Sequence, residues 1–143
     1  MLSYDDRIAL QELKAKYCRL LDTKDWDGFG RLFAPDAKLS PVDDLPGVTY
    51  EGAAGIRDGV AKALHDVISV HHTHLPEFSR DGADEATGIW AMEDMLWFGK
   101  SSSAPGMFVH GFGHYRERYR LVQGRWLFQN VELHRLRIET RSS

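Results

Sequence analysis

The sequence has one cysteine, no long apolar run and almost no excess of charge. The lone Cys18 excludes a disulfide within the chain and fits a reducing compartment. No stretch approaches the roughly 20 apolar residues that span a bilayer, so no membrane partner is expected. A net charge of −3, with basic residues balanced by acids, argues against nucleic acid as a partner. Because the N-terminus opens on charged residues and not on an apolar signal run, we expect a cytoplasmic protein.

The length fits one domain, over residues 1–143, with one hydrophobic core. The first part of the chain has helical periodicity. Ser3 is a suitable N-cap for a helix that continues to about Asp22. Its apolar face carries Leu10, Leu13, Tyr17, Leu20 and Leu21. A short second helix is predicted within residues 24–37, and a third from about Ala53 to His65.

From His71 onward the periodicity is that of strands, separated by turn signals at "RDGADE", "GKSSSAPG" and "VQGR". In the stretch "EATGIWAMEDMLWF", one face of the predicted strand carries Trp90, Met92 and Asp94, and the opposite face is also mostly apolar. Such a strand needs cover on both sides, from helices and from a cavity or a partner subunit. Helices followed by an antiparallel sheet predict an α+β fold, with the helices packed on one face of a curved sheet.

The stretch "VHHTHL" places His71, His72 and His74 close together. On a strand, His72 and His74 share one face and His71 takes the other, so at most two of them could bind one metal ion. A zinc site needs three or four converging ligands, and the sequence signals no third ligand. We therefore expect no metal site, which leaves a catalytic base or hydrogen-bonded surface imidazoles.

Two polar residues of the first predicted helix are candidates for a site. Tyr17 lies on the apolar face, where a core tyrosine is the ordinary interpretation, but a buried hydroxyl needs a partner and could present its proton to a ligand. Asp22 lies at the predicted C-terminal end, where the helix dipole disfavours an anion. A nearby imidazolium would compensate it, and a carboxylate that orients a histidine is what a general base requires. The alternative is that Asp22 caps the next helix or faces water.

Two charged residues lie on apolar strand faces. Asp94 shares its face with Trp90 and Met92, and Arg135 shares a later face with Val131. Isolated charges on such faces are costly unless they are paired. Asp94 and Arg135 therefore form either a buried pair that serves only the structure or part of a site.

The runs "LQELKAKYCRLLDTKDWDGFGRLFAPDA", "HHTHLPEFSRDGADEATGIWAMEDMLWF" and "GHYRERYRLVQGRWLF" resemble the SnoaL-like branch of the nuclear-transport-factor-two-like superfamily over nearly the whole chain. The resemblance implies a cone-shaped α+β barrel, with three helices packed on a strongly curved, mostly antiparallel sheet around a deep apolar pocket. Within this branch the site is most similar to those of bile-acid 7α-dehydratases and scytalone dehydratases. The matching residues are Tyr17, Asp22, His71, Asp94 and Arg135.

This resemblance implies a cofactor-independent dehydratase, a lyase that removes water from an apolar cyclic hydroxy-ketone such as a steroid or polyketide. His71 would abstract a proton beside a carbonyl, Asp22 would fix its tautomer, and Tyr17 would bind the carbonyl or protonate the departing hydroxide. Asp94 and Arg135 would set the polarity of the pocket. The expected walls of the pocket are Trp26, Trp90, Met92 and Tyr115. The reaction needs neither a metal nor an organic cofactor.

Other functions remain open for the same fold. An isomerase or cyclase would use the same base without loss of water, and a ligand-binding protein or a dioxygenase small subunit would use no base at all. Apolar residues such as Met95 and Trp97 need cover, and related dehydratases form trimers, so we expect a homotrimer, with a dimer as the alternative.

Overall fold

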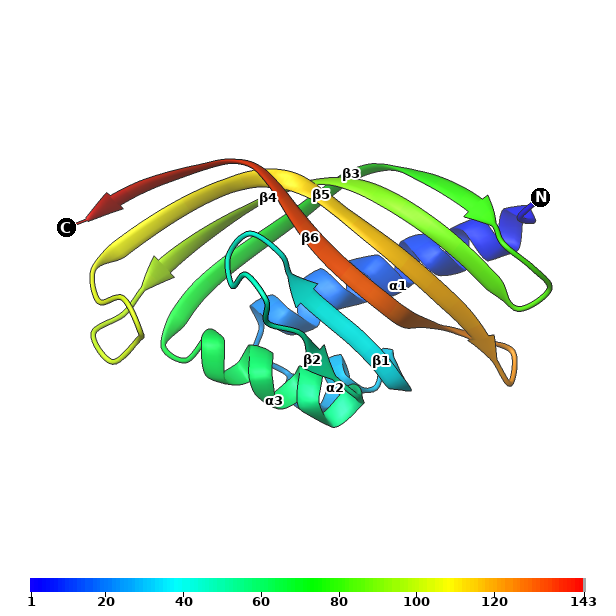
Figure 1. Ribbon diagram of the computed structural model, residues 1–143, viewed down its shortest axis with the longest axis horizontal. Coiled ribbons are helices and arrows are strands. Elements are labelled where there is room, and N and C mark those ends of the chain that lie inside the picture. Colours follow the sequence, from blue (N-terminus) through cyan, green and yellow to red (C-terminus); the bar gives the residue numbers. More distant parts are fainter. Residues whose placement is uncertain (143) are drawn as a thin grey trace.

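The computed structural model describes residues 1–142, in which three helices lie against one face of a six-stranded sheet (Figure 1). The elements in chain order are α1 (Tyr4–Asp22), α2 (Trp26–Gly30), β1 (Phe33–Pro41), β2 (Tyr50–Glu51), α3 (Ala53–Ala63), β3 (Val67–Arg80), β4 (Glu85–Phe98), β5 (Met107–Val122) and β6 (Arg125–Ser142). The predicted α+β class, with three helices on a mostly antiparallel sheet, is confirmed.

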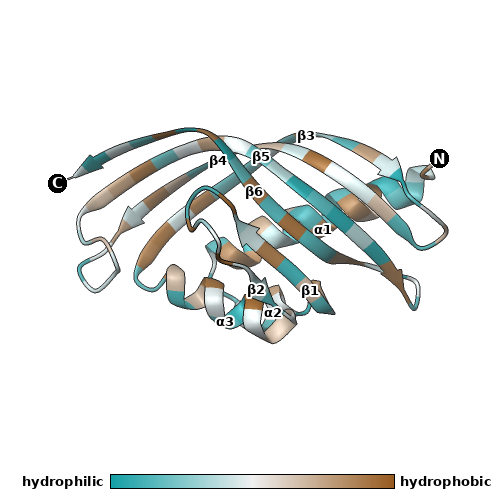
Figure 2. Ribbon diagram, viewed as in Figure 1, coloured by the Kyte–Doolittle hydropathy of each residue, from teal (hydrophilic) through white to brown (hydrophobic). Residues whose placement is uncertain are grey.

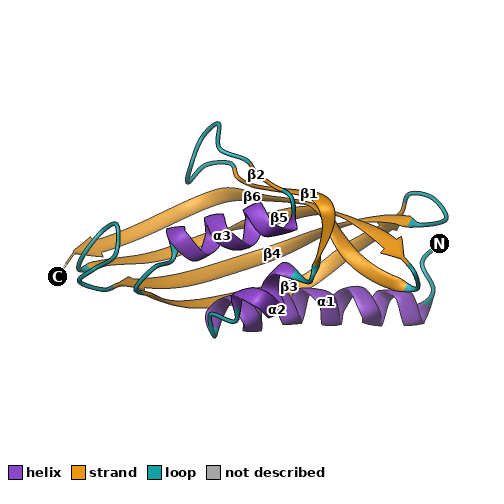
Figure 3. Cartoon of the chain, turned by 90° about the horizontal axis from the view of Figure 1, so that it is seen from below, coloured by secondary structure: helices purple, strands orange, loops and turns teal. Residues whose placement is uncertain are grey.

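The sheet has the strand order β2-β1-β6-β5-β4-β3. The pair of β1 and β6 is parallel, and the other neighbouring strands pair antiparallel. The sheet curves around the helices, which cover its concave face (Figures 1 and 3). Because β2 and β3 remain as edges, the cone is open along one side and does not close into a complete barrel.

Hydrophobic and hydrophilic residues alternate along the long strands (Figure 2). In β4 the two faces differ in burial: Gly88, Trp90, Met92 and Asp94 are buried, whereas the residues between them are only partly buried. The core between the two layers is rich in aromatic rings. This alternation turns the polar group of Asp94 toward the interior, where it needs a partner.

Helix α1 begins and ends where the sequence predicts. The Ser3 hydroxyl accepts the Asp6 N–H at 3.0 Å, and Asp5 and Asp6 lie in the first turn, where carboxylates favour the helix dipole. The helix ends at Asp22, as the sequence predicts. Because the chain turns away there, the Asp22 side chain can reach the neighbouring strand β3.

The sequence did not predict two of the strands, β1 and β2. Residues Phe33–Pro41 form β1, although the segment contains two prolines, and β2 is only two residues long. The register between β1 and β6 shifts between Phe33 and Lys38, which accommodates Pro35. Strand β3 also begins at Val67, four residues before the predicted change of periodicity. Among the described residues, no helix is both long and apolar enough to span a membrane.

Candidate active site

The C-terminal end of α1 meets β3 at Asp22 and His71. The His71 ring nitrogen Nδ1 lies 2.7 Å from Asp22 Oδ1, and the His71 backbone N–H donates to Asp22 Oδ2 at 2.8 Å. Both carboxylate oxygens thus bind one residue, which fixes the imidazole relative to the carboxylate. Since a carboxylate only accepts, Nδ1 carries the hydrogen and Nε2 is the unprotonated nitrogen of the neutral ring.

The free nitrogen of His71 faces Asp94. These two residues are directly opposite in the ladder between β3 and β4, and His71 Nε2 lies 3.6 Å from Asp94 Oδ2. This distance is longer than a hydrogen bond, so Nε2 remains available as a base. The side chains of His71 and Asp94 are only 7% and 2% exposed, so their mutual electrostatics are weakly screened.

Asp94 is held by Arg135 of β6. The guanidinium donates to both Asp94 oxygens, at 2.6 and 3.0 Å, and on its other side to both oxygens of Asp44, at 3.1 and 3.0 Å. Burial opposes the charge of Arg135, but the hydrogen bonds to Asp94 and Asp44 outweigh it and raise the pKa of the guanidinium. Asp43 accepts the Arg135 backbone N–H at 2.6 Å. The loop between β1 and β2 is thereby attached to the site.

Gly111 of β5 makes room for this ion pair. It lies opposite Asp94 in the ladder between β4 and β5. A Cβ atom at Gly111 would lie 2.6 Å from Asp94 Oδ1 and closer still to Arg135 Nη1. Any other residue here would displace the guanidinium.

Tyr17 packs among aromatic rings. Its ring centroid lies 5.1 Å from that of Phe29 and 5.4 Å from that of Phe128, and its hydroxyl shares a hydrogen bond with that of Tyr115. Burial raises the pKa of both tyrosines well above the ordinary value, and Asp94 adds to the rise in each. Both hydroxyls are therefore in their protonated forms at neutral pH. Within residues 1–142, no hydrogen bond joins Tyr17 to Asp22 or His71.

The expected walls of the pocket are divided between different places. Met92 lies beside the ion pair, with its sulfur 3.9 Å from Arg135 Nη1. Trp90 donates its indole N–H to the Tyr119 hydroxyl at 2.9 Å. Trp26 packs edge to face on Phe29 and lines a separate hollow of about 290 Å³. Trp26 is therefore not grouped with Trp90 and Met92.

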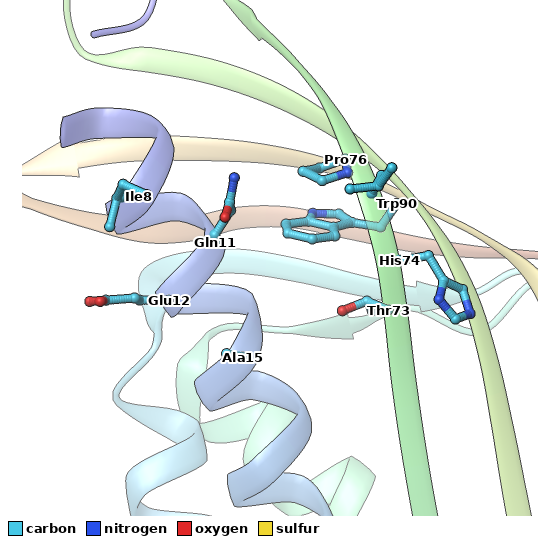
Figure 4. Close-up of a pocket in the computed structure, with 9 residues that line it drawn as sticks. Ile8, Gln11, Glu12, Ala15, Thr73, His74, Pro76 and Trp90 are labelled. Atoms are coloured by element: carbon cyan, nitrogen blue, oxygen red, sulfur yellow. The ribbon is translucent and has the colours of Figure 1, made fainter. Parts of the chain in front are cut away.

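Trp90 also lines a groove of about 680 Å³ between α1 and β3 (Figure 4). The other lining residues are Ile8, Gln11, Glu12, Ala15, Thr73, His74, Leu75 and Pro76. Neither Asp22 nor His71 belongs to this lining. The groove reaches Thr73, two residues along β3 from His71, so it lies next to the buried histidine without exposing it.

The remaining histidines of "VHHTHL" lie close to Glu93, and His74 also borders the groove. His72 pairs in register with Glu93, and His74 Nε2 lies 3.1 Å from Glu93 Oε2. His110 contacts the same carboxylate at 3.1 Å. Within the described residues, no group of three or more His, Cys, Asp or Glu residues has the geometry to hold a metal ion.

Sequence analysis missed two polar connections. Lys14 and Glu117 form an ion pair whose side chains are both fully buried, with Lys14 Nζ 3.6 Å above the centre of the Tyr17 ring. Lys14 could have been found, since it falls next to Leu13 on the apolar stripe of the helix. Lys24 and Ser69 connect to Asp22 through hydrogen bonds between segments 45 and 47 residues apart in sequence, and no sequence pattern signals them.

Comparison with known proteins supports one family. A family model described as a SnoaL-like domain matches residues 3–132. A protein of Gibberella zeae named "Probable cyclase FGR4" is 26% identical over 135 residues, which are 89% of each chain. The structure of hexachlorocyclohexane dehydrochlorinase LinA-type3 from Novosphingobium barchaimii has a TM-score of 0.78 and 18% identity, covering 94% of this chain and 89% of that one. A variant of Rv3472, a protein of unknown function from Mycobacterium tuberculosis, has a TM-score of 0.78 and 24% identity, covering 94% and 79%.

Proposed function

The chain belongs to the SnoaL-like domain family, and we propose that it is a cofactor-independent dehydratase acting on an apolar cyclic hydroxy-ketone such as a steroid or polyketide. The observation that carries the proposal is the two-point contact between Asp22 and His71, which leaves Nε2 as the basic nitrogen. The dehydrochlorinase named above shares the fold, and loss of hydrogen chloride is, like loss of water, an elimination.

In the proposed reaction, His71 Nε2 takes a proton from the carbon beside the substrate carbonyl. The resulting imidazolium lies between the carboxylates of Asp22 and Asp94, which stabilise its charge. The electron pair of the broken C–H bond forms the new double bond as the β C–O bond breaks. The departing hydroxide takes a proton from Tyr17 or from the imidazolium and leaves as water.

Tyr17 and Arg135 have different proposed roles. Burial raises the pKa of Tyr17, so its hydroxyl carries a proton at neutral pH and can donate it to a carbonyl or to the hydroxide. Arg135 holds Asp94 beside Nε2 and sets the polarity around the reacting atoms. The proposed apolar contacts of the substrate are Trp90, Met92 and Tyr115. Trp26 lines a separate hollow and is not among these contacts.

The buried position of His71 requires an opening before substrate can enter. We propose that the loop of residues 42–49 moves. The carboxylates of Asp43 and Asp44 hold it over Arg135, and the Val42 N–H ties its start to the Leu133 carbonyl at 3.1 Å. Substrate that enters there would meet Arg135 first and His71 behind it.

A cyclase is the second candidate, because the curated relative bears that name and the same base would serve it. A panel of β-hydroxy-ketone steroids and polyketides separates the candidates. A dehydratase produces a conjugated enone, seen by ultraviolet absorbance and by loss of one water in the mass spectrum. A cyclised or isomerised product of unchanged mass would replace the dehydratase with a cyclase or isomerase. Binding without any product across the panel would favour a ligand-binding protein or a dioxygenase small subunit.

A further inference from the structure

The turn after α1 holds a lysine where glycine is the usual residue. Lys24 has φ +61°, in the left-handed region, its N–H donates to the Leu21 carbonyl at 3.1 Å, and the Asp25 N–H donates to the Leu20 carbonyl at 2.9 Å. This pair of bonds is the Schellman end of a helix, whose left-handed position strongly favours glycine. A glycine would relieve this strain, but it would lack the side chain that Lys24 extends to Ser69.

The Lys24 side chain reaches back to the site through Ser69. Lys24 Nζ donates to Ser69 Oγ at 2.7 Å, and the Ser69 hydroxyl donates to Asp22 Oδ1 at 2.9 Å. The same Asp22 oxygen binds His71 Nδ1. Ser69 is buried, and partial burial lowers the pKa of Lys24 while the Asp22 charge partly offsets this effect. A continuous chain of hydrogen bonds thus runs from a cation to the imidazole.

The charges around His71 show what this chain can do. Asp22 faces one ring nitrogen and Asp94 the other, and both favour the protonated ring. A base must be neutral before it can accept a proton. Each carboxylate has a cation behind it: Arg135 binds Asp94 directly, and Lys24 reaches Asp22 through Ser69.

The other ionisable groups on this side of α1 are the buried Lys14–Glu117 ion pair, whose charges oppose each other, and two groups that are neutral at neutral pH. Cys18 and Tyr17 of α1 are both buried, and burial raises the pKa of each above its ordinary value. The charges nearest to His71 are therefore the carboxylates of Asp22 and Asp94, with Lys24 behind the first and Arg135, itself shared with Asp44, behind the second.

We infer that Ser69 and Lys24 are positioning residues of the Asp22–His71 pair: Ser69 fixes the Asp22 carboxylate, and the charge of Lys24 opposes the protonation of His71. The catalytic part of this inference rests on the proposed function. The effect on the protonation of His71 does not, and it can be measured without a substrate.

The test is an NMR titration of the histidine ring signals, with the His71 signal assigned by its loss in His71→Gln. Lys24→Met and Ser69→Ala should each move the titration midpoint of His71 upward by about half a pH unit or more, because the imidazolium loses an opposing charge or Asp22 loses a competing donor. A role limited to holding the turn predicts no shift, or a downward shift as the pair loosens. Lys16→Met removes the same charge from an exposed site on α1 and should leave the midpoint unchanged.

Lys24→Gly separates function from folding. Glycine relieves the left-handed strain, so this variant should melt at the same or a higher temperature than the wild type and still show the upward shift. If Ser69→Ala does not fold, the titration of Lys24→Gly can still refute the inference. Unchanged midpoints in folded Lys24→Met and Lys24→Gly would overturn the inference.

Activity provides a second readout that distinguishes this inference from the proposed function. If the wild type turns over a hydroxy-ketone, Lys24→Met should move the acid limb of the kcat profile upward and leave KM unchanged. An absence of turnover in the wild type would count against the dehydratase, whereas the NMR shifts would still decide the role of Ser69 and Lys24.

Discussion

Replacing Gly111 by alanine should break the ion pair beside the proposed base. The added methyl group would meet Asp94 Oδ1 at 2.6 Å, with Arg135 Nη1 closer still. Such distances are not found for real Cβ atoms. Because Asp94 is paired with neighbouring strands on both sides, opposite His71 and Gly111, we expect the Arg135 guanidinium to move away from it.

The expected cost follows from the burial of the pair. The side chains of Arg135 and Asp94 are 6% and 2% exposed, and breaking a pair at such a site costs about 3–5 kcal/mol. Arg135 keeps Asp44 as a partner, so we take the lower end, about 3 kcal/mol. Replacing glycine by alanine also lowers the conformational entropy of the unfolded chain, which offsets about 0.5–1 kcal/mol of this loss. The net loss of stability should be about 2 kcal/mol.

Urea denaturation followed by tryptophan fluorescence measures this loss. Gly55→Ala is the matched control, since Gly55 lies on the exposed side of α3 and an added Cβ would have nothing within 4 Å. The control should be unchanged or more stable, by about 0.5–1 kcal/mol. If Gly111→Ala unfolds at the same urea concentration as the wild type, the pair is not the constraint that we describe.

Three further predictions concern buried ionisable groups, Tyr17 and the assembly. Burial raises the pKa values of Tyr17 and Cys18 above their ordinary values of 10.0 and 9.0. At a pH above these ordinary values, the two groups ionise in the unfolded chain before they ionise in the folded one, so the free energy of unfolding should fall as the pH rises above about 9. A free energy of unfolding that stays constant from pH 8 to 11 would contradict this prediction. Tyr17→Phe should lower kcat less than about tenfold if Tyr17 orients the carbonyl, and roughly 10²-fold or more if it protonates the hydroxide, whereas unchanged kcat and KM would remove it from the site. Light scattering at micromolar concentration should show a homotrimer, or alternatively a dimer, because Trp97 remains 42% exposed on the outer face of the sheet and needs cover. A monomer would argue against this face as a contact between subunits.

The long elements could be predicted because their periodicity is strong. Leucine spacing in α1 indicated its extent and its buried side, and the pattern of β4 indicated its extent and the residues that share each face. Strand β1 could not be predicted in this way, since its prolines are typical of loops and its pairing with β6 depends on residues about 90 positions later. Local patterns do not record such a distant partner.

The site, too, could be predicted from the sequence only in part. The types and positions of Asp22 and His71 suggested a contact, and an unpaired Asp94 on an apolar face required a partner such as Arg135. The connection of Lys24 to Ser69 could not be predicted, because a lysine after a helix and a serine in a strand are both ordinary on a surface. The burial of His71 away from the groove at Trp90 also depends on how side chains fill the cone.

The most direct test of the proposed base compares elimination by the wild type and by His71→Ala on the same hydroxy-ketone. Both proteins should bind the substrate with similar affinity, and circular dichroism should show the same fold. Formation of the conjugated enone should fall roughly 10²–10⁴-fold in His71→Ala, the usual contribution of a positioned proton-transfer group. Asp22→Asn should lose nearly as much, because the amide cannot support the imidazolium. Turnover that survives unchanged in His71→Ala would contradict the proposed mechanism.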